Sequence, residues 1–260
     1  MEQSAAWISR HALPLAALLL IAVSLGAGLA WRPHAPHADH QRKRGAQRAA
    51  RVLAGLVMLL LFIVLAVGVQ QHAGLVRFDI ALAQQLHQAL PLPALRIIAS
   101  LTEVGDPKLL ALAAAVVGGW LAVARHWRQL ALWCFTLAGI VLLDESLKAC
   151  FRRPRPLDGH GYMVASGWSF PSGHAAGSLV FYGLLAHLLL RQIAPGRQRL
   201  LIATAAMLVA LTGLSRILLQ VHYLSDVLAG YALAAAWLIA CLSMAEQLWP
   251  PRATWRHGSR

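Results

Sequence analysis

Long apolar stretches separated by short charged segments run through the whole chain. Seven stretches contain no Asp, Glu, Lys or Arg: Ala12–Trp31, Val52–Val76, Leu109–Ala124, Gln129–Leu143, Gly173–Leu190, Leu200–Ser215 and Val227–Ala245. A helix crosses the hydrocarbon core of a bilayer with about 20 mostly apolar residues. The third and fourth stretches are short, but charged side chains at their ends can reach the interface. The pattern predicts an all-α, polytopic bundle of membrane helices, a six-helix core with one extra N-terminal span.

The first stretch divides the chain into parts. Residues 1–51 are expected to form a membrane anchor and a basic cytoplasmic linker, residues 52–245 the six-span core, and residues 246–260 a basic cytoplasmic tail. The stretch ends in GAGLAWRP, which weakly resembles a signal-peptidase site, but it is longer than the roughly 7–15 apolar residues of a signal peptide. An uncleaved anchor is therefore favoured over a cleaved signal. The linker histidines His34, His37 and His40 lack a carboxylate cluster, which favours a solvated loop over a metal site.

The composition agrees with a membrane protein. Hydrophobic residues make up 58% of the chain and charged residues 13%, and the mean hydropathy is +0.59. A soluble domain carries about 25% charged residues. The net charge of +13 could suggest nucleic acid, but its distribution around the apolar stretches argues against that partner. The three cysteines show no ligand spacing, so we expect no disulfide framework and no metal site. No obligate protein partner is inferred.

Polar residues gather at three places beside these stretches. The segment LKACFRRPRP follows the fourth stretch, SFPSGH opens the fifth, and LSRILLQVHYLSD joins the sixth to the seventh. Successive spans alternate in direction, so the three segments are expected to meet at one membrane face. Polar residues in or near spans are costly and therefore indicate a functional site. Read alone, Pro171-Ser172-Gly173 is equally an ordinary helix start.

The residue types at this face suit phosphate chemistry. Guanidinium groups match phosphate oxygens, and a helix N-terminus favours negative charge. His222 and Asp226 are four residues apart, so one helical turn can bring the carboxylate beneath the ring. That carboxylate would fix the tautomer and leave the other nitrogen free to attack, with His174 as general acid and base. The cluster lacks the carboxylates or cysteines of a metallophosphatase. It therefore favours metal-free phosphoryl transfer through a phosphohistidine, without a cofactor.

At these residues the chain resembles the type 2 phosphatidic acid phosphatase superfamily. The family's three-part signature is matched, in order, by Lys148-x6-Arg155-Pro156, by Pro171-Ser172-Gly173-His174 and by Ser215-Arg216-x5-His222-x3-Asp226. The resemblance covers about residues 52–245, which leaves residues 1–51 as an addition. A weaker likeness to the bacterial members' first external loop lies in RFDIALAQ, residues 77–84, and in TEVGD, residues 102–106.

The resemblance implies a role for each matched position. His222 would take the phosphoryl group, Asp226 would orient it, and His174 would protonate the leaving oxygen and then activate water. The phosphate oxygens would be held by Lys148, Arg155 and Arg216, with further donors from the Ser172 hydroxyl and the Gly173 N–H. Arg152 and Arg153 could contact a second phosphate or anionic headgroups, or could simply flank the site; a slight preference for a diphosphate substrate rests on them.

The implied substrate is a membrane lipid phosphate, since the site lies at the headgroup level. Undecaprenyl diphosphate, phosphatidylglycerophosphate, phosphatidate and the lipid A phosphates all fit, because the signature reads the phosphate and not the lipid. A phosphotransferase using the same phosphohistidine and a non-hydrolytic lipid-phosphate binding or translocating protein are the alternatives. The related vanadate-dependent haloperoxidases are soluble, which the seven apolar stretches disfavour.

Selectivity is expected to come from lateral grooves between spans and from the loop 71–107. In that loop Phe78, Leu82, Leu86 and Leu90 repeat every four residues, as in an amphipathic helix. Such a helix could gate lipid entry or could simply pack on the core, and the sequence favours neither.

The distribution of basic residues predicts the orientation. If the linker is cytoplasmic, 14 of the 23 Lys and Arg residues lie on that side: Arg32, Arg42, Lys43, Arg44, Arg48, Arg51, Arg125, Arg128, Arg191, Arg197, Arg199, Arg252, Arg256 and Arg260. Five of the other nine belong to the segments LKACFRRPRP and LSRILLQVHYLSD. The positive-inside rule then places the protein in the cell (inner) membrane with its active site on the periplasmic or other extracytoplasmic face.

Overall fold

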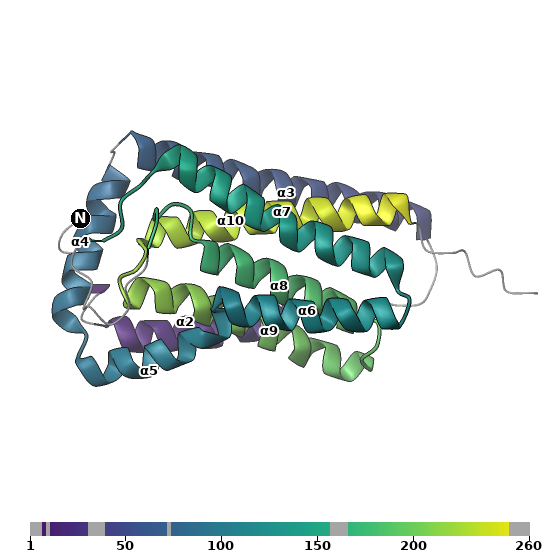
Figure 1. Cartoon of the computed structure of the whole chain (residues 1–260), viewed down its shortest axis with the longest axis horizontal. Coiled ribbons are helices and arrows are strands. Elements are labelled where there is room, and N and C mark those ends of the chain that lie inside the picture. The colour runs from purple at the N-terminus through teal and green to yellow at the C-terminus, as the bar shows by residue number, and fades with distance from the viewer. Residues whose placement is uncertain (1–6, 9–10, 31–39, 72–73, 157–165, 250–260) are drawn as a thin grey trace, which may run out of the picture.

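The computed structural model describes residues 7–8, 11–30, 40–71, 74–156 and 166–249, and it is built from helices throughout these ranges (Figure 1). Residues 31–39 of the linker, the segment 157–165 and the tail from residue 250 lie outside the described residues. Seven long helices run roughly along the long axis: α2 (Ala12–Ala30), α3 (His40–Gln70), α6 (Pro107–Val123), α7 (Trp127–Phe151), α8 (Gly173–Leu189), α9 (Pro195–Leu218) and α10 (Leu224–Leu248). Two further helices, α4 (Gly74–Ala89) and α5 (Leu92–Thr102), and the 3₁₀ turn η1 (Glu103–Gly105) lie toward one end.

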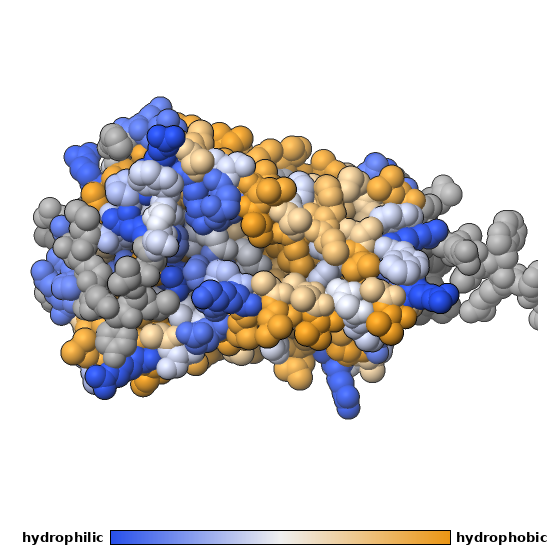
Figure 2. All heavy atoms as spheres, in the orientation of Figure 1, coloured by the Kyte–Doolittle hydropathy of each residue, from blue (hydrophilic) through white to orange (hydrophobic). Residues whose placement is uncertain are grey.

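The all-helical membrane bundle expected from the sequence is confirmed. Six segments of the described chain are long and apolar enough to cross a bilayer: 12–29, 45–70, 92–123, 127–151, 195–218 and 224–248. The seventh, α8, is also apolar but has only 17 residues. Figure 2 shows apolar side chains gathered around the middle of the visible face and hydrophilic ones toward both ends, as a bilayer requires.

Helix α8 lies inside the bundle, in contact with α6, α7, α9 and α10. Helix α10 packs along α3 on its other side, and α2 packs along α9. Small residues allow these close crossings, as is usual between membrane helices. A Cβ on Gly230 of α10 would lie 2.6 Å from the Ser172 carbonyl oxygen at the start of α8. The glycine therefore brings two of the polar segments together.

The amphipathic helix expected in the loop 71–107 is α4, and its apolar face is packed. Leu82, Leu86 and Leu90 are buried against Leu95 of α5 and Leu218 at the end of α9. Of the two interpretations that the sequence left open, the structure supports packing on the core. Asp79 lies on the same buried face of α4 and is 1% exposed.

Candidate active site

The three polar segments meet at the end of the bundle where α7 and α9 finish and α8 and α10 begin (Figure 1). Lys148 is in the last turn of α7 and Arg155 in the segment after it, while Arg216 is in the last turn of α9. Ser172, Gly173 and His174 form the start of α8, and His222 and Asp226 flank the start of α10. The structure therefore brings all eight expected site residues to the same end of the molecule.

His222 and Asp226 are close, but not through a regular helical turn. His222 precedes α10, and Asp226 accepts a hydrogen bond of 2.9 Å from the Tyr223 backbone N–H at the helix start. The His222 Nδ1 lies 3.6 Å from Asp226 Oδ2, which is an electrostatic contact and too long for a hydrogen bond. Catalytic hydrogen bonds are often this long before substrate binds. The spacing predicted the proximity correctly and the local geometry incorrectly.

Arg155 faces the other nitrogen of the His222 ring. Its Nη1 lies 3.1 Å from His222 Nε2 and donates to the Val221 carbonyl at 2.7 Å. The same guanidinium donates to the carbonyl oxygens of Ser166 and Gly167, each at 3.0 Å. Arg155 therefore places positive charge at the nitrogen expected to attack, and it fixes the backbone around that nitrogen.

The start of α8 is closely packed against Lys148. A Cβ on Gly173 would lie 2.5 Å from Asp144 Oδ2 and 3.0 Å from Lys148 Nζ, so only glycine fits. Lys148 forms an ion pair of 2.6 Å with Asp144, a buried acid that the sequence analysis did not single out. Ser172 occupies the N-cap position without a side-chain capping bond, and its buried hydroxyl has no hydrogen-bond partner among the described residues. This donor is therefore available to a ligand.

His174 follows directly, half-buried, in the first turn of α8. Its imidazole interacts electrostatically with Arg216, His222, Lys148 and Arg155, which places it among the cations of the site. Arg216 is 2% exposed. Its neighbourhood is shaped by the TEVGD segment: Thr102 and Ser215 hydroxyls are 2.6 Å apart, and Asp106 interacts electrostatically with the guanidinium.

Arg152 and Arg153, for which the sequence left several roles open, have different environments. Arg152 is exposed, and its Nε donates to the Ala149 carbonyl at the end of α7. Arg153 is buried between two carboxylates, at 2.8 Å from Asp79 and 2.5 Å from Asp226. Arg153 is thus held by protein groups, which removes one of the two cations on which the slight preference for a diphosphate rested.

Burial lowers the pKa of His222 to about 4, although the Asp226 carboxylate acts in the opposite direction. The ring is therefore neutral at pH 7, as a nucleophile requires. Within the described ranges no group of three or more His, Cys, Asp or Glu side chains could hold a metal ion. What the site offers is a neutral imidazole, a second imidazole, three cations and a helix N-terminus, a set that can bind a phosphate and accept a phosphoryl group.

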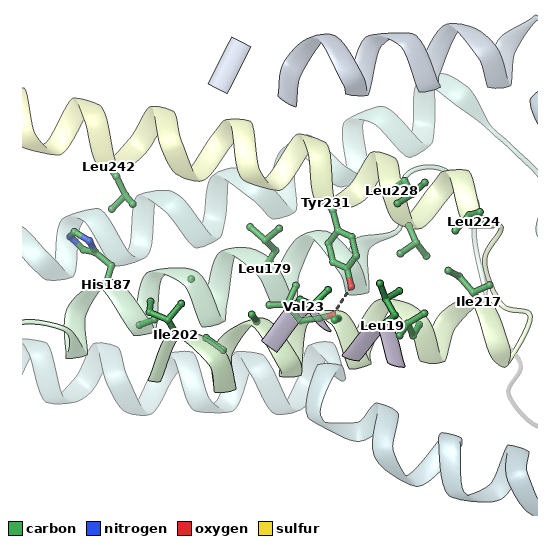
Figure 3. A pocket seen from close by; sticks show the side chains of 18 of the residues that line it. Leu19, Val23, Leu179, His187, Ile202, Ile217, Leu224, Leu228, Tyr231 and Leu242 are labelled. Carbon is green, nitrogen blue, oxygen red and sulfur yellow. Dashed lines mark hydrogen bonds between the residues drawn. The ribbon is translucent and has the colours of Figure 1, made fainter. Parts of the chain in front are cut away.

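An apolar groove of about 670 Å³ lies among α2, α8, α9 and α10, and residues next to this site in the sequence form one of its ends (Figure 3). Ile217 and Leu224 line its near end, directly after Arg216 and shortly after His222 in the sequence. His187 and Leu242 line the far end, and Leu19 of α2 forms part of one wall. One end of the groove is thus formed by residues next to the polar site in the sequence, although none of the eight expected site residues lines it.

Comparison with known proteins finds a family model, a related protein and a crystal structure that are similar to this chain. Residues 129–250 match the family model of the PAP2 superfamily, a range that includes every expected site residue. Phosphatidylglycerophosphatase B of Bacillus subtilis (strain 168) is 28% identical over 140 residues, which are 53% of this chain and 68% of that protein. The crystal structure of a transmembrane PAP2-type phosphatidylglycerolphosphate phosphatase from Bacillus subtilis matches with a TM-score of 0.68 and 24% identity, over 76% of this chain and 98% of that one. That structure supports the fold.

Proposed function

The chain belongs to the PAP2 superfamily and is a transmembrane lipid phosphate phosphatase of that type, and from this premise we propose that it hydrolyses its substrate through a phosphohistidine at His222. The observation that supports this most directly is the placement of the His222 ring. One nitrogen faces the Asp226 carboxylate and the other faces a guanidinium, in a ring that is 2% exposed and neutral. A phosphoryl group bound by that cation would meet a nitrogen lone pair.

The proposed reaction has two steps. His222 Nε2 attacks the phosphorus, the bond from phosphorus to the lipid oxygen breaks, and His174 gives its proton to that oxygen. Water then loses a proton to His174 and attacks the phosphorus, the P–N bond breaks, and inorganic phosphate leaves. Asp226 favours the positive ring that exists between the two steps.

The remaining site residues would stabilise the charge that builds on the phosphate oxygens. Lys148, Arg155 and Arg216 are cations around the start of α8, and fixed donors of this kind are worth most in a site with little water. The unpartnered Ser172 hydroxyl and the Gly173 N–H at the start of α8 would add two neutral donors.

Among the four candidate lipids we place phosphatidylglycerophosphate first. The relative from Bacillus subtilis is named for that substrate, and the pairing of Arg153 with two carboxylates removes one of the two cations on which the preference for a diphosphate rested. The lipid chain would lie in the groove lined at one end by Ile217 and Leu224 (Figure 3), because its lining is apolar and these two residues closely follow Arg216 and His222 in the chain.

The domain division and the location complete the proposal. Residues 1–51 would form an anchor and linker, residues 52–245 the catalytic core, and residues 246–260 a tail. The protein would reside in the cell (inner) membrane with His222 on the extracytoplasmic side, since the excess of basic residues lies around the opposite ends of the spans.

The test is phosphate release by the detergent-purified chain from the four lipids, with and without EDTA. We expect release, fastest from phosphatidylglycerophosphate and unaffected by EDTA. Absence of release with tight lipid binding would support the non-hydrolytic alternative, and transfer of the phosphate to an added acceptor lipid in place of water would support the phosphotransferase. Loss of activity in EDTA with rescue by a divalent cation would contradict the phosphohistidine mechanism.

A further inference from the structure

We propose that Arg153 and Asp79 position the catalytic carboxylate Asp226, so that α4, a helix outside the six spans, controls the rate at His222. This inference rests on the proposed function. It assigns Arg153 to catalysis through another residue, in place of the contact with a second phosphate that its position in the sequence suggested.

The contacts form a continuous chain from α4 to the nucleophile. Asp79 Oδ2 accepts a bond of 2.8 Å from Arg153 Nη2. Arg153 Nη1 donates to Asp226 Oδ1 at 2.5 Å and to the Ser225 hydroxyl at 2.8 Å. The other oxygen of Asp226 is the one that lies 3.6 Å from His222 Nδ1. Arg153 thus holds one carboxylate oxygen, while the second oxygen accepts hydrogen bonds from the Ser169 hydroxyl and the Tyr223 N–H and also faces the imidazole.

Asp79 fixes Arg153 and the start of α10 together. Besides the guanidinium, it accepts hydrogen bonds from the Ser225 hydroxyl and from the Ser225 backbone N–H, the latter at 3.2 Å. Ser225 is the residue before Asp226, so the carboxylate of α4 sets the backbone position of the catalytic acid. The Arg153 guanidinium also lies 4.2 Å from the centre of the Tyr223 ring, which limits its movement on that side.

The charges in this cluster explain why the arrangement is specific. Asp79, Arg153 and Asp226 are all buried, at 1%, 7% and 0% exposure. A buried charge is tolerated only when it is paired and hydrogen-bonded. One guanidinium between two carboxylates leaves a net charge of −1, and that charge would stabilise the positive His222 ring formed when phosphorus is bound. Removing the Arg153 charge would leave two buried carboxylates unpaired beside the nucleophile, whereas removing the Asp79 charge would leave a neutral Arg153–Asp226 pair without the net charge of −1.

The experiment compares Arg153→Gln and Asp79→Asn with the control Arg152→Gln, in phosphate release from a lipid monophosphate and a lipid diphosphate. Arg152 is exposed, and within the described part of the chain its Nε donates to the Ala149 carbonyl and it makes no hydrogen bond to Asp226. We expect kcat to fall about 10–100-fold in the first two variants, as for other residues that orient a catalytic ligand, with KM unchanged for both lipids. Arg152→Gln should match the unmodified protein.

A double-mutant comparison separates positioning from a merely structural role. If Arg153 acts through Asp226, then Arg153→Gln in an Asp226→Asn background should cause little further loss of kcat. Arg153→Lys keeps one charge for Asp226 and should recover part of the rate. If Arg153→Gln does not elute as a single species from detergent gel filtration, Asp79→Asn and Arg153→Lys supply the comparison.

Three results would overturn the inference. The first is a kcat for both Arg153→Gln and Asp79→Asn equal to that of Arg152→Gln. The second is a rise in KM for the diphosphate lipid alone, which would return Arg153 to substrate binding. The third is a loss of kcat in the double variant, Arg153→Gln with Asp226→Asn, that equals the product of the losses in the two single variants. Absence of turnover in the unmodified chain would instead reject the proposed function, and the positioning role with it.

Discussion

His222 is neutral at pH 7 because burial lowers its pKa to about 4. Protonation of this ring would remove the lone pair that attacks phosphorus, so the fraction of active enzyme falls only as the pH approaches that value. At higher pH the nucleophile is fully available. Any decline of kcat/KM between pH 7 and 5 should then come from another group, and the second ionisation of a phosphate monoester, near a pKa of about 6, is the obvious one.

A pH series tests this assignment. We expect the acidic limb of kcat/KM to move when short-chain phosphate esters with different second pKa values are compared. A limb that stays near pH 6.5 for every ester would instead indicate titration of an ordinary histidine in the free enzyme.

Substitution of the two histidines and the acid should divide their roles. His222→Ala and His174→Ala should each abolish turnover, because one removes the attacking nitrogen and the other the proton donor. Asp226→Asn should retain a small rate, perceptibly above that of His222→Ala, since the ring remains without its orienting charge. All three are measured by phosphate release from protein that elutes normally in detergent. Near-normal turnover by His222→Ala would contradict the phosphohistidine.

At the same scale, the sequence predicts the members of the site better than their contacts. Lys148, His174 and His222 could be grouped because spans alternate in direction. The pairing of Arg153 with Asp79 was missed, since it joins residues that are 74 positions apart. One signal was available: Asp79, Leu82 and Leu86 share a helix face, so an acid stands in a row of buried leucines and needs a cation.

At the scale of the helices, the site depends on how closely α10 approaches the start of α8. Gly230 makes this approach possible, because a Cβ there would lie 2.6 Å from the carbonyl oxygen of Ser172. The Ser172 N–H donates to the Asp226 carbonyl at 3.0 Å, so the same crossing joins the helix that binds phosphate to the helix that carries the acid.

We therefore expect Gly230→Ala to displace the start of α8 and to lower kcat/KM by about 10–100-fold, the range for a catalytic group moved by about 1 Å. The matched control is Gly177→Ala on α8, where a Cβ would have no neighbour within 4 Å. That change should leave activity intact. Equal activities in the two variants would show that the crossing tolerates a methyl group.

The groove between α9 and α10 gives a second test at this scale. Ala206 lines the groove, whereas Met207 on the same helix is 41% exposed and does not. In Ala206→Phe the larger side chain would displace part of the lipid chain from the groove. If two methylenes are displaced, at about 0.8 kcal/mol each, KM for a long-chain lipid phosphate should rise about tenfold. Hydrolysis of a short-chain phosphate should not change, and Met207→Phe should affect neither substrate. Equal effects of Ala206→Phe on both substrates would argue against a chain in the groove.

The helices themselves follow from the apolar pattern, with two exceptions that have physical causes. The fourth apolar stretch ends at Leu143, yet α7 continues to Phe151, because the ion pair of Lys148 with Asp144 makes the charged turn compatible with the bundle. The third stretch starts at Leu109, yet the apolar segment that could cross the membrane starts at residue 92, because it includes α5 and η1 as well as α6. Asp106 interrupts this segment, and its side chain caps the start of α6. Charge alone marks neither boundary.

For the whole molecule, the open question is which end faces the cytoplasm. Every expected site residue lies at one end of the bundle. At the other end Arg125 and Arg191 lie in turns, and the first residues of α7 and α9 include Arg128, Arg197 and Arg199. Arg51 belongs to that end too, since it pairs with Glu246 near the finish of α10. Basic residues in short loops favour the cytoplasmic side, so we expect the site to be extracytoplasmic.

Cysteine labelling in intact spheroplasts tests this orientation, in a background without Cys134, Cys150 and Cys241. Gln88→Cys on α4 and Gly196→Cys at the start of α9 place exposed thiols at opposite ends of the bundle. A membrane-impermeant thiol reagent should modify Gln88→Cys and should reach Gly196→Cys only after the membrane is permeabilised. Because a charged headgroup crosses a bilayer only at high cost, the labelled end decides which leaflet supplies the substrate. The reverse labelling pattern would place hydrolysis in the cytoplasm and exclude lipids whose phosphate is exposed on the outer leaflet.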